Sequence, residues 1–126
     1  MAKSVIHEKS FHFALEVVGL FKKLQAEREY VLSKQLLRSG TSIGANVEEA
    51  LAGQSRKDFL SKMAVASKEA RETRYWLVLL QKSGLTAVEL NPALKNIEEL
   101  IRILTSIVKT TAESPATQNS KLKTQN

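Results

Sequence analysis

The chain has 126 residues, 43% hydrophobic and 25% charged, which fits one globular domain with a continuous core and is too short for two. The absence of cysteine excludes disulfides, thiolate catalysis and cysteine-ligated metals. Nineteen Lys and Arg against thirteen Asp and Glu give a formal charge of +6, which favours polyanionic partners. No stretch approaches the roughly 18 apolar residues of a membrane span, and the N-terminus lacks an apolar signal core, so we expect a cytoplasmic protein without membrane contact.

Hydrophobic periodicity predicts helices and no strands. The first helix is expected from Ser10 to Arg28, with two neighbouring apolar stripes that form one broad face. The stripes are Phe11, Ala14, Val18 and Phe21, and beside them Phe13, Val17, Leu20 and Leu24. The second helix is expected from Glu29 to Leu51, ending near Gly53, which we predict to be a left-handed C-cap.

The middle of the second helix, QLLRSGTSIGANVEEA, carries two glycines four residues apart, Gly40 and Gly44. Glycine inside a helix costs about 0.5–1 kcal/mol relative to alanine, so the pair predicts that a neighbouring helix approaches closely here. A phosphate-binding loop is excluded because no lysine follows the second glycine and no strand precedes the first. The predicted core stripe of this helix is Leu32, Leu36, Ser39, Ile43, Val47 and Ala50.

The third helix is expected to be capped by Ser55, with Asp58 three residues on, and to stop at Gly84. Its predicted core stripe is Phe59, Met63, Ala66, Ala70, Thr73, Leu77 and Leu80. Asn91 and Pro92 indicate the N-cap and first turn of the fourth helix. Its apolar positions are Leu94, Ile97, Leu100 or Ile101, Leu104, and Ile107 or Val108.

Short connections between four helices predict an all-α fold, an antiparallel up-down-up-down four-helix bundle. We assign residues 1–112 to the bundle. Residues 113–126, ESPATQNSKLKTQN, offer almost nothing to bury and are predicted to be a disordered polar tail.

Residues 75–80 of the third helix, YWLVLL, are apolar around the whole circumference, which predicts burial on all sides. We therefore expect an oligomer interface that includes Tyr75, Trp76 and Leu79, unless the fourth helix or its connector covers them. Charges on the same helix segregate, with an acidic flank of Asp58, Val65, Glu69, Glu72 and Trp76 and a basic flank of Lys57, Lys68, Arg71 and Tyr75. Two flanks of opposite charge can meet head to tail and close a ring, with Glu69 and Glu72 in the interface. The alternative is ordinary solvated pairs at i,i+4, such as Lys68 with Glu72.

Signals for catalysis or metal binding are poor. His7 and His12 are five residues apart, which turns their rings about 140° from each other on a helix and does not match a zinc-protease pattern. Ser106 and Lys109 match Ser-x-x-Lys without its companion motifs. We expect no enzyme activity, no catalytic or metal site and no cofactor.

Three stretches, EKSFHFALEVV, QLLRSGTSIGANVEEA and SRKDFLSKMAVASKEARETRYWLVLL, resemble the bacterial four-helix-bundle proteins of 23S rRNA intervening sequences. The resemblance covers roughly residues 9–109. It implies a bundle that assembles as a ring-like homo-oligomer, with a pentamer known among relatives, and it implies no enzyme activity. More distant relatives include the accessory variability proteins of retroelements, which bind nucleic acid and a reverse transcriptase.

Two functions fit these observations. The first is a nucleic-acid-associated accessory protein that binds RNA or DNA through backbone charge, with Lys57, Lys68, Arg71 and Tyr75 as the binding residues. The second is a structural or protein-recruiting scaffold, with a reverse transcriptase as one possible partner, that does not bind nucleic acid directly. Residues 1–112 carry seventeen basic and twelve acidic side chains, or +5, and a pentamer would carry about five times that charge.

Overall fold

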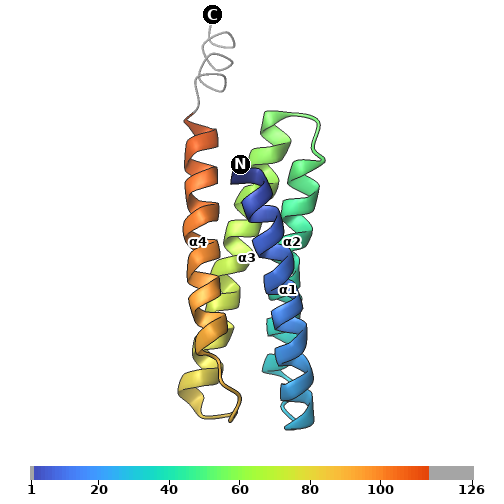
Figure 1. Ribbon diagram of the computed structural model, residues 1–126, viewed down its shortest axis with the longest axis vertical. Coiled ribbons are helices and arrows are strands. Elements are labelled where there is room, and N and C mark those ends of the chain that lie inside the picture. Colours follow the sequence, from blue (N-terminus) through green and yellow to red (C-terminus); the bar gives the residue numbers. More distant parts are fainter. Residues whose placement is uncertain (1, 114–126) are drawn as a thin grey trace, which may run out of the picture.

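Four helices and no strands make up the part of the chain that the computed structural model describes, residues 2–113, with side chains from Val5 onward. The helices are α1 (Ala2–Ala26), α2 (Leu32–Leu51), α3 (Arg56–Ser83) and α4 (Asn91–Ala112). They run alternately down and up (Figure 1), and each packs on the next, whereas the contact between α1 and α4 is less extensive than any of these. The predicted all-α class is confirmed. The predicted tail lies outside the described residues, except for Glu113.

Helix α1 begins at Ala2, well before the predicted start at Ser10. Ile6 explains the difference, because it is fully buried and extends the inner of the two predicted stripes by two turns. That stripe, Phe13, Val17, Leu20 and Leu24, is buried as predicted. The outer stripe is not: Phe11 is 60% exposed, so the buried face of α1 is narrower than the sequence indicated.

The close approach predicted at the glycines of α2 is confirmed. A Cβ atom placed on Gly40 would lie 2.8 Å from Cγ2 of Val17, and one on Gly44 would lie 3.3 Å from the backbone oxygen of Ser10. Helix α1 therefore rests directly on the backbone of α2. Ser10 is itself buried, and its hydroxyl donates to the carbonyl oxygen of His7, so the tight contact leaves no orphaned polar side chain there.

The predicted core stripes of α2 and α3 are confirmed almost throughout. Among the residues of the predicted stripes, only Leu32 in α2 and Phe59 in α3 are partly exposed. Between these helices the hydroxyls of Ser39 and Thr73, both fully buried, lie 2.9 Å apart, and the Thr73 hydroxyl is also 2.8 Å from the Glu69 carbonyl oxygen. Small hydroxyl residues thus allow α2 and α3 to pack closely while their polar atoms stay hydrogen-bonded.

Helix α3 begins and ends as predicted. Ser55 is its N-cap, and the Ser55 hydroxyl accepts the Asp58 backbone N–H over 3.0 Å. Gly84 closes the helix in the left-handed region at φ 72°, which glycine adopts without strain.

Two predicted caps are wrong. The residue that ends α2 is Ala52, in a right-handed conformation, and Gly53 does not adopt a positive φ. Gly53 instead lies against its own helix, where a Cβ would be 3.1 Å from the carbonyl oxygen of Ala50. At α4 the N-cap position is Leu90 rather than Asn91, whose side chain accepts a hydrogen bond from Gln81.

The start of α2 is capped from outside the helix. Glu29 accepts the backbone N–H groups of Val31 and Leu32, both over 3.1 Å, and of Ser33 over 2.6 Å. Burial acts to raise the pKa of the Glu29 carboxyl, but these donors outweigh it and hold the pKa below its usual range. Because Glu29 serves as a cap, the helix starts three residues later than predicted. The turn before it places Arg28 at φ 65°, a strained value for a residue with a side chain.

Candidate nucleic-acid and oligomer interface

The basic flank predicted on α3 faces outward. Lys57, Lys68 and Arg71 are exposed, and Tyr75 beside them is 59% exposed. Arg71 donates from Nη2 to the Thr105 hydroxyl of α4 over 3.0 Å, which fixes part of its guanidinium without neutralising its charge. This flank therefore presents positive charge and one aromatic ring to solvent, the combination that phosphates and unstacked bases contact.

The acidic flank of α3 has a partner within the same chain. Arg38 on α2 lies between two of its carboxylates, with Nη1 3.5 Å from Oε1 of Glu69 and Nη2 bonded to Oε2 of Glu72. Lys62 on α3 is likewise 3.2 Å from Oε1 of Glu49 on α2. The i,i+4 partners suggested by the sequence are therefore largely replaced by pairs between helices. A head-to-tail ring contact between the two flanks would have to compete with Arg38.

Trp76 is partly buried and packs against the hydrophobic core. Its indole N–H donates to Oε2 of Glu72 over 2.9 Å. That hydrogen bond holds the pKa of the Glu72 carboxyl below its usual range, opposed by burial and helped by Arg38 and Lys68. Trp76 is therefore partly covered within a single bundle, and its polar partner, Glu72, lies one turn earlier on the same helix, where Arg38 of α2 binds it in turn. Leu79 is also only partly exposed.

Sequence reasoning missed a second exposed apolar surface, on the outer side of α1. Phe11 is 60% and Leu15 54% exposed, one helical turn apart, on the side of α1 away from the core. On α3, Val65 (41%) on the acidic flank and Tyr75 (59%) on the basic flank are also exposed, ten residues apart. Helices α1 and α3 are not neighbours in the bundle, so these two surfaces lie on opposite corners. The sequence shows that Phe11 and Leu15 share one face of a helix. It does not show how α1 is rotated, and therefore that this face points away from the core.

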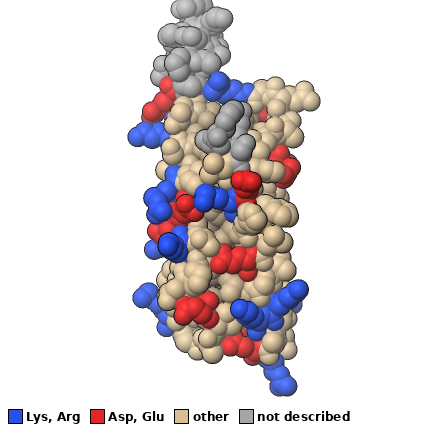
Figure 2. All heavy atoms as spheres, in the orientation of Figure 1, with Lys and Arg blue, Asp and Glu red and all other residues tan. Residues whose placement is uncertain are grey.

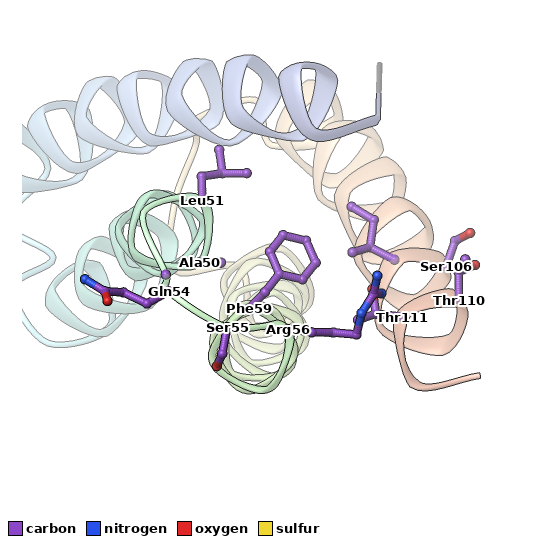
Figure 3. A pocket seen from close by; sticks show the side chains of 11 residues that line it. Ala50, Leu51, Gln54, Ser55, Arg56, Phe59, Ser106, Thr110 and Thr111 are labelled. Atoms are coloured by element: carbon purple, nitrogen blue, oxygen red, sulfur yellow. The ribbon is translucent and has the colours of Figure 1, made fainter. Parts of the chain in front are cut away.

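A cavity with a volume of about 550 Å³ lies at the end of the bundle where α2 turns into α3. Figure 3 shows Phe59 of α3 projecting into it, with the end of α2 on one side and the last turns of α4 on the other. Leu51, Phe59 and Ile107 make its apolar part, and Arg56 and Thr111 are among the polar residues at its edge. None of the predicted site residues lines this cavity.

The two histidines of α1 have different neighbours. His7 pairs with Glu48 of α2, and the His12 ring lies against the edge of Phe11. Within the described part of the chain no three His, Asp or Glu side chains lie together in a way that would hold a metal ion. Among residues 2–113, no helix combines the length and the apolar character of a membrane span.

The comparisons with known proteins place the chain in a family. No curated protein matches it. It is similar to a crystal structure of a protein of unknown function from the S23 ribosomal protein family of Bacteroides thetaiotaomicron, with 46% sequence identity and a TM-score of 0.83. The match covers 87% of this chain and 100% of that chain. The sequence model described as 23S rRNA-intervening sequence protein matches residues 2–106. The chain therefore belongs to the 23S rRNA-intervening sequence protein family.

Proposed function

We propose that the protein is a non-enzymatic, homo-oligomeric accessory factor that associates with RNA or DNA through backbone charge. The observation that carries the proposal is the difference between the two flanks of α3. Two acidic side chains, Glu69 and Glu72, are paired with Arg38 within the chain, whereas Lys57, Lys68 and Arg71 remain exposed to solvent. With a formal charge of +6, the chain has an excess of positive charge that it does not neutralise internally.

The exposed apolar surfaces of α1 and α3 support self-association. Phe11 and Leu15 are exposed one turn apart on α1, and soluble monomers rarely leave large apolar side chains exposed at neighbouring positions without a use for them. Because the two surfaces lie on opposite corners of the bundle, one copy can contact the next in a heterologous manner, which closes into a ring when the rotation allows. We expect Tyr75, Trp76, Leu79, Glu69 and Glu72 to lie at or near this interface, and a pentamer to be the assembled form.

The test is charge reversal of the basic flank, Lys68→Glu with Arg71→Glu, with binding to a single-stranded RNA and oligomer mass measured on the same preparation. The proposal predicts that affinity falls for every sequence tested and that the oligomer persists, since phosphate contacts carry no sequence information. The matched control, Arg102→Glu with Lys109→Glu, makes the same charge change at exposed positions of α4 and should retain more binding.

Two other results would count against this proposal. Loss of the oligomer in the Lys68→Glu, Arg71→Glu variant would place the flank in the subunit interface instead. A wild-type protein that binds no RNA or DNA would favour the alternative function, a scaffold that recruits another protein such as a reverse transcriptase.

A further inference from the structure

The two connectors at the lower end of the bundle in Figure 1 touch one another. They are the turn between α1 and α2 (residues 27–31) and the segment between α3 and α4 (residues 84–90). Glu27 of the first accepts hydrogen bonds from the Thr86 hydroxyl and, over 3.0 Å, from the Ala87 backbone N–H of the second. We call this part of the molecule, with the adjoining helix turns, the connector end.

Unpaired basic side chains gather at the connector end. Along the sides of the bundle, four basic residues have acidic partners: Lys9 with Glu99, Arg38 with Glu69 and Glu72, Lys62 with Glu49, and Arg74 with Glu98. At the connector end, six exposed basic residues have no ion pair or side-chain hydrogen bond to any described residue. They are Lys22, Lys23, Arg28, Lys34, Lys82 and Lys95. Figure 2 shows basic side chains projecting outward at this end.

The acidic residues of the connector end form no ion pair with these basic residues, and each instead accepts hydrogen bonds from the backbone. Glu27 binds the second connector, and Glu29 caps α2. Glu89 accepts the Asn91 backbone N–H over 2.9 Å at the start of α4. Six basic and three acidic residues leave a formal charge of +3 at this end of each chain.

Local helix electrostatics do not explain the lysine at the start of α2. Helix N-termini carry partial positive charge and favour acidic residues, yet the first turn of α2 has none and contains Lys34. Two large side chains next to it, Tyr30 and Val31, are 49% and 71% exposed. Positive charge that the fold does not require, beside an exposed aromatic ring, is the composition of a surface for single-stranded nucleic acid.

We propose that the connector end is the principal surface for single-stranded nucleic acid, with the basic residues on the phosphates and Tyr30 stacked on a base. This inference rests on the proposed function and moves the main contact away from the flank of α3. Each phosphate contact should add roughly 0.7 to the steepness of log affinity against log salt, so several contacts give a strong dependence between about 50 and 200 mM salt.

The variant Arg28→Gly with Lys34→Glu tests the proposal. Glycine relieves the positive φ at position 28, and glutamate suits the first turn of α2, so thermal stability should be unchanged or higher. Affinity for a 20-nucleotide oligouridylate, measured by fluorescence anisotropy, should fall about tenfold or more, with a shallower salt dependence. Arg102→Ala with Lys109→Glu removes the same formal charge elsewhere and should bind much more like the wild type.

Two further measurements strengthen the test. Tyr30→Ala should weaken binding to the single strand more than to a duplex of equal length, because only unpaired bases can stack. Lys22→Gln with Lys82→Gln changes exposed side chains only and should also lower the affinity for RNA. This variant keeps the proposal testable even if Arg28→Gly with Lys34→Glu fails to fold.

The outcomes separate this inference from the proposed function. Suppose that the connector variants bind RNA like the wild type and that Lys68→Glu with Arg71→Glu abolishes binding. This result would overturn the inference and leave the proposed function standing. Binding of polyglutamate as tight as that of oligouridylate would also overturn it. A wild-type protein that binds no nucleic acid would contradict both.

Discussion

Substituting leucine for Gly44 should strongly destabilise the bundle. The first added atom would already lie 3.3 Å from the Ser10 carbonyl oxygen, and the rest of the side chain would have to displace the backbone of α1. Overpacking of this kind typically costs about 1–3 kcal/mol, and backbone cannot yield as a flexible side chain does, so we expect the upper part of this range or more. Each kcal/mol lowers Tm by about 4–8 °C in a domain of roughly 100 residues.

Thermal melts followed by circular dichroism measure this effect, and Gly19→Ala is the matched control. Gly19 also lies inside a helix, but nothing comes within 4 Å of a Cβ built there. Alanine at position 19 should raise the free energy of unfolding by about 0.5–1 kcal/mol through helix propensity alone. The two glycine substitutions thus have opposite expected signs. Equal melting temperatures for Gly44→Leu and the wild type would mean that α1 does not rest on the backbone of α2.

Removing the cap on α2 should have the next largest effect on stability. Glu29→Ala leaves three backbone N–H groups without their acceptor, and comparable losses of a helix cap cost about 1–2 kcal/mol. Glu89→Ala is the control, because Glu89 is exposed and accepts a single backbone N–H, so its loss should be smaller. Urea titrations at pH 7 give the free energies of unfolding. Equal losses for the two variants would contradict the assigned cap.

The Glu29 cap also predicts a pH dependence. The pKa of this carboxyl is lowered in the folded protein, so its contribution to stability is complete at pH values above the unfolded pKa. The contribution is lost as the pH falls through the lower folded pKa, because protonation in the folded state then breaks the cap. Acidification below about pH 5 should therefore reduce the stability of the wild type more than that of Glu29→Ala. Parallel profiles of stability against pH for the two proteins would count against the Glu29 cap.

The sequence predicts the features that depend on one helix at a time. The stripe from Met63 to Leu80 follows from helical periodicity, and the Ser55 cap follows from local residue types. The glycines of α2 also revealed a close approach, because glycine within a helix needs a compensating contact. In each case the residues that determine the structure lie within a few turns of each other.

What the sequence could not predict depends on how the helices are rotated against one another. Phe11 belongs to a plausible apolar stripe, and only the packing of α1 on α2 turns it outward. The network in which Trp76 donates to Glu72 and Arg38 of α2 binds Glu72 could not be predicted either, because it joins two helices. The connector end was not predicted for the same reason, since Lys34 and Lys82 are far apart in the chain and lie at the same end of the molecule only because α2 and α3 run in opposite directions.

Native mass spectrometry of the full chain at micromolar concentration, with and without a short single-stranded RNA, tests the central claim most directly. The account predicts a homo-oligomer, with a pentamer as the main species, and a further set of peaks that differ by the mass of bound RNA and disappear as the salt concentration rises. A spectrum dominated by a monomer of 14.0 kDa that acquires no RNA would contradict it.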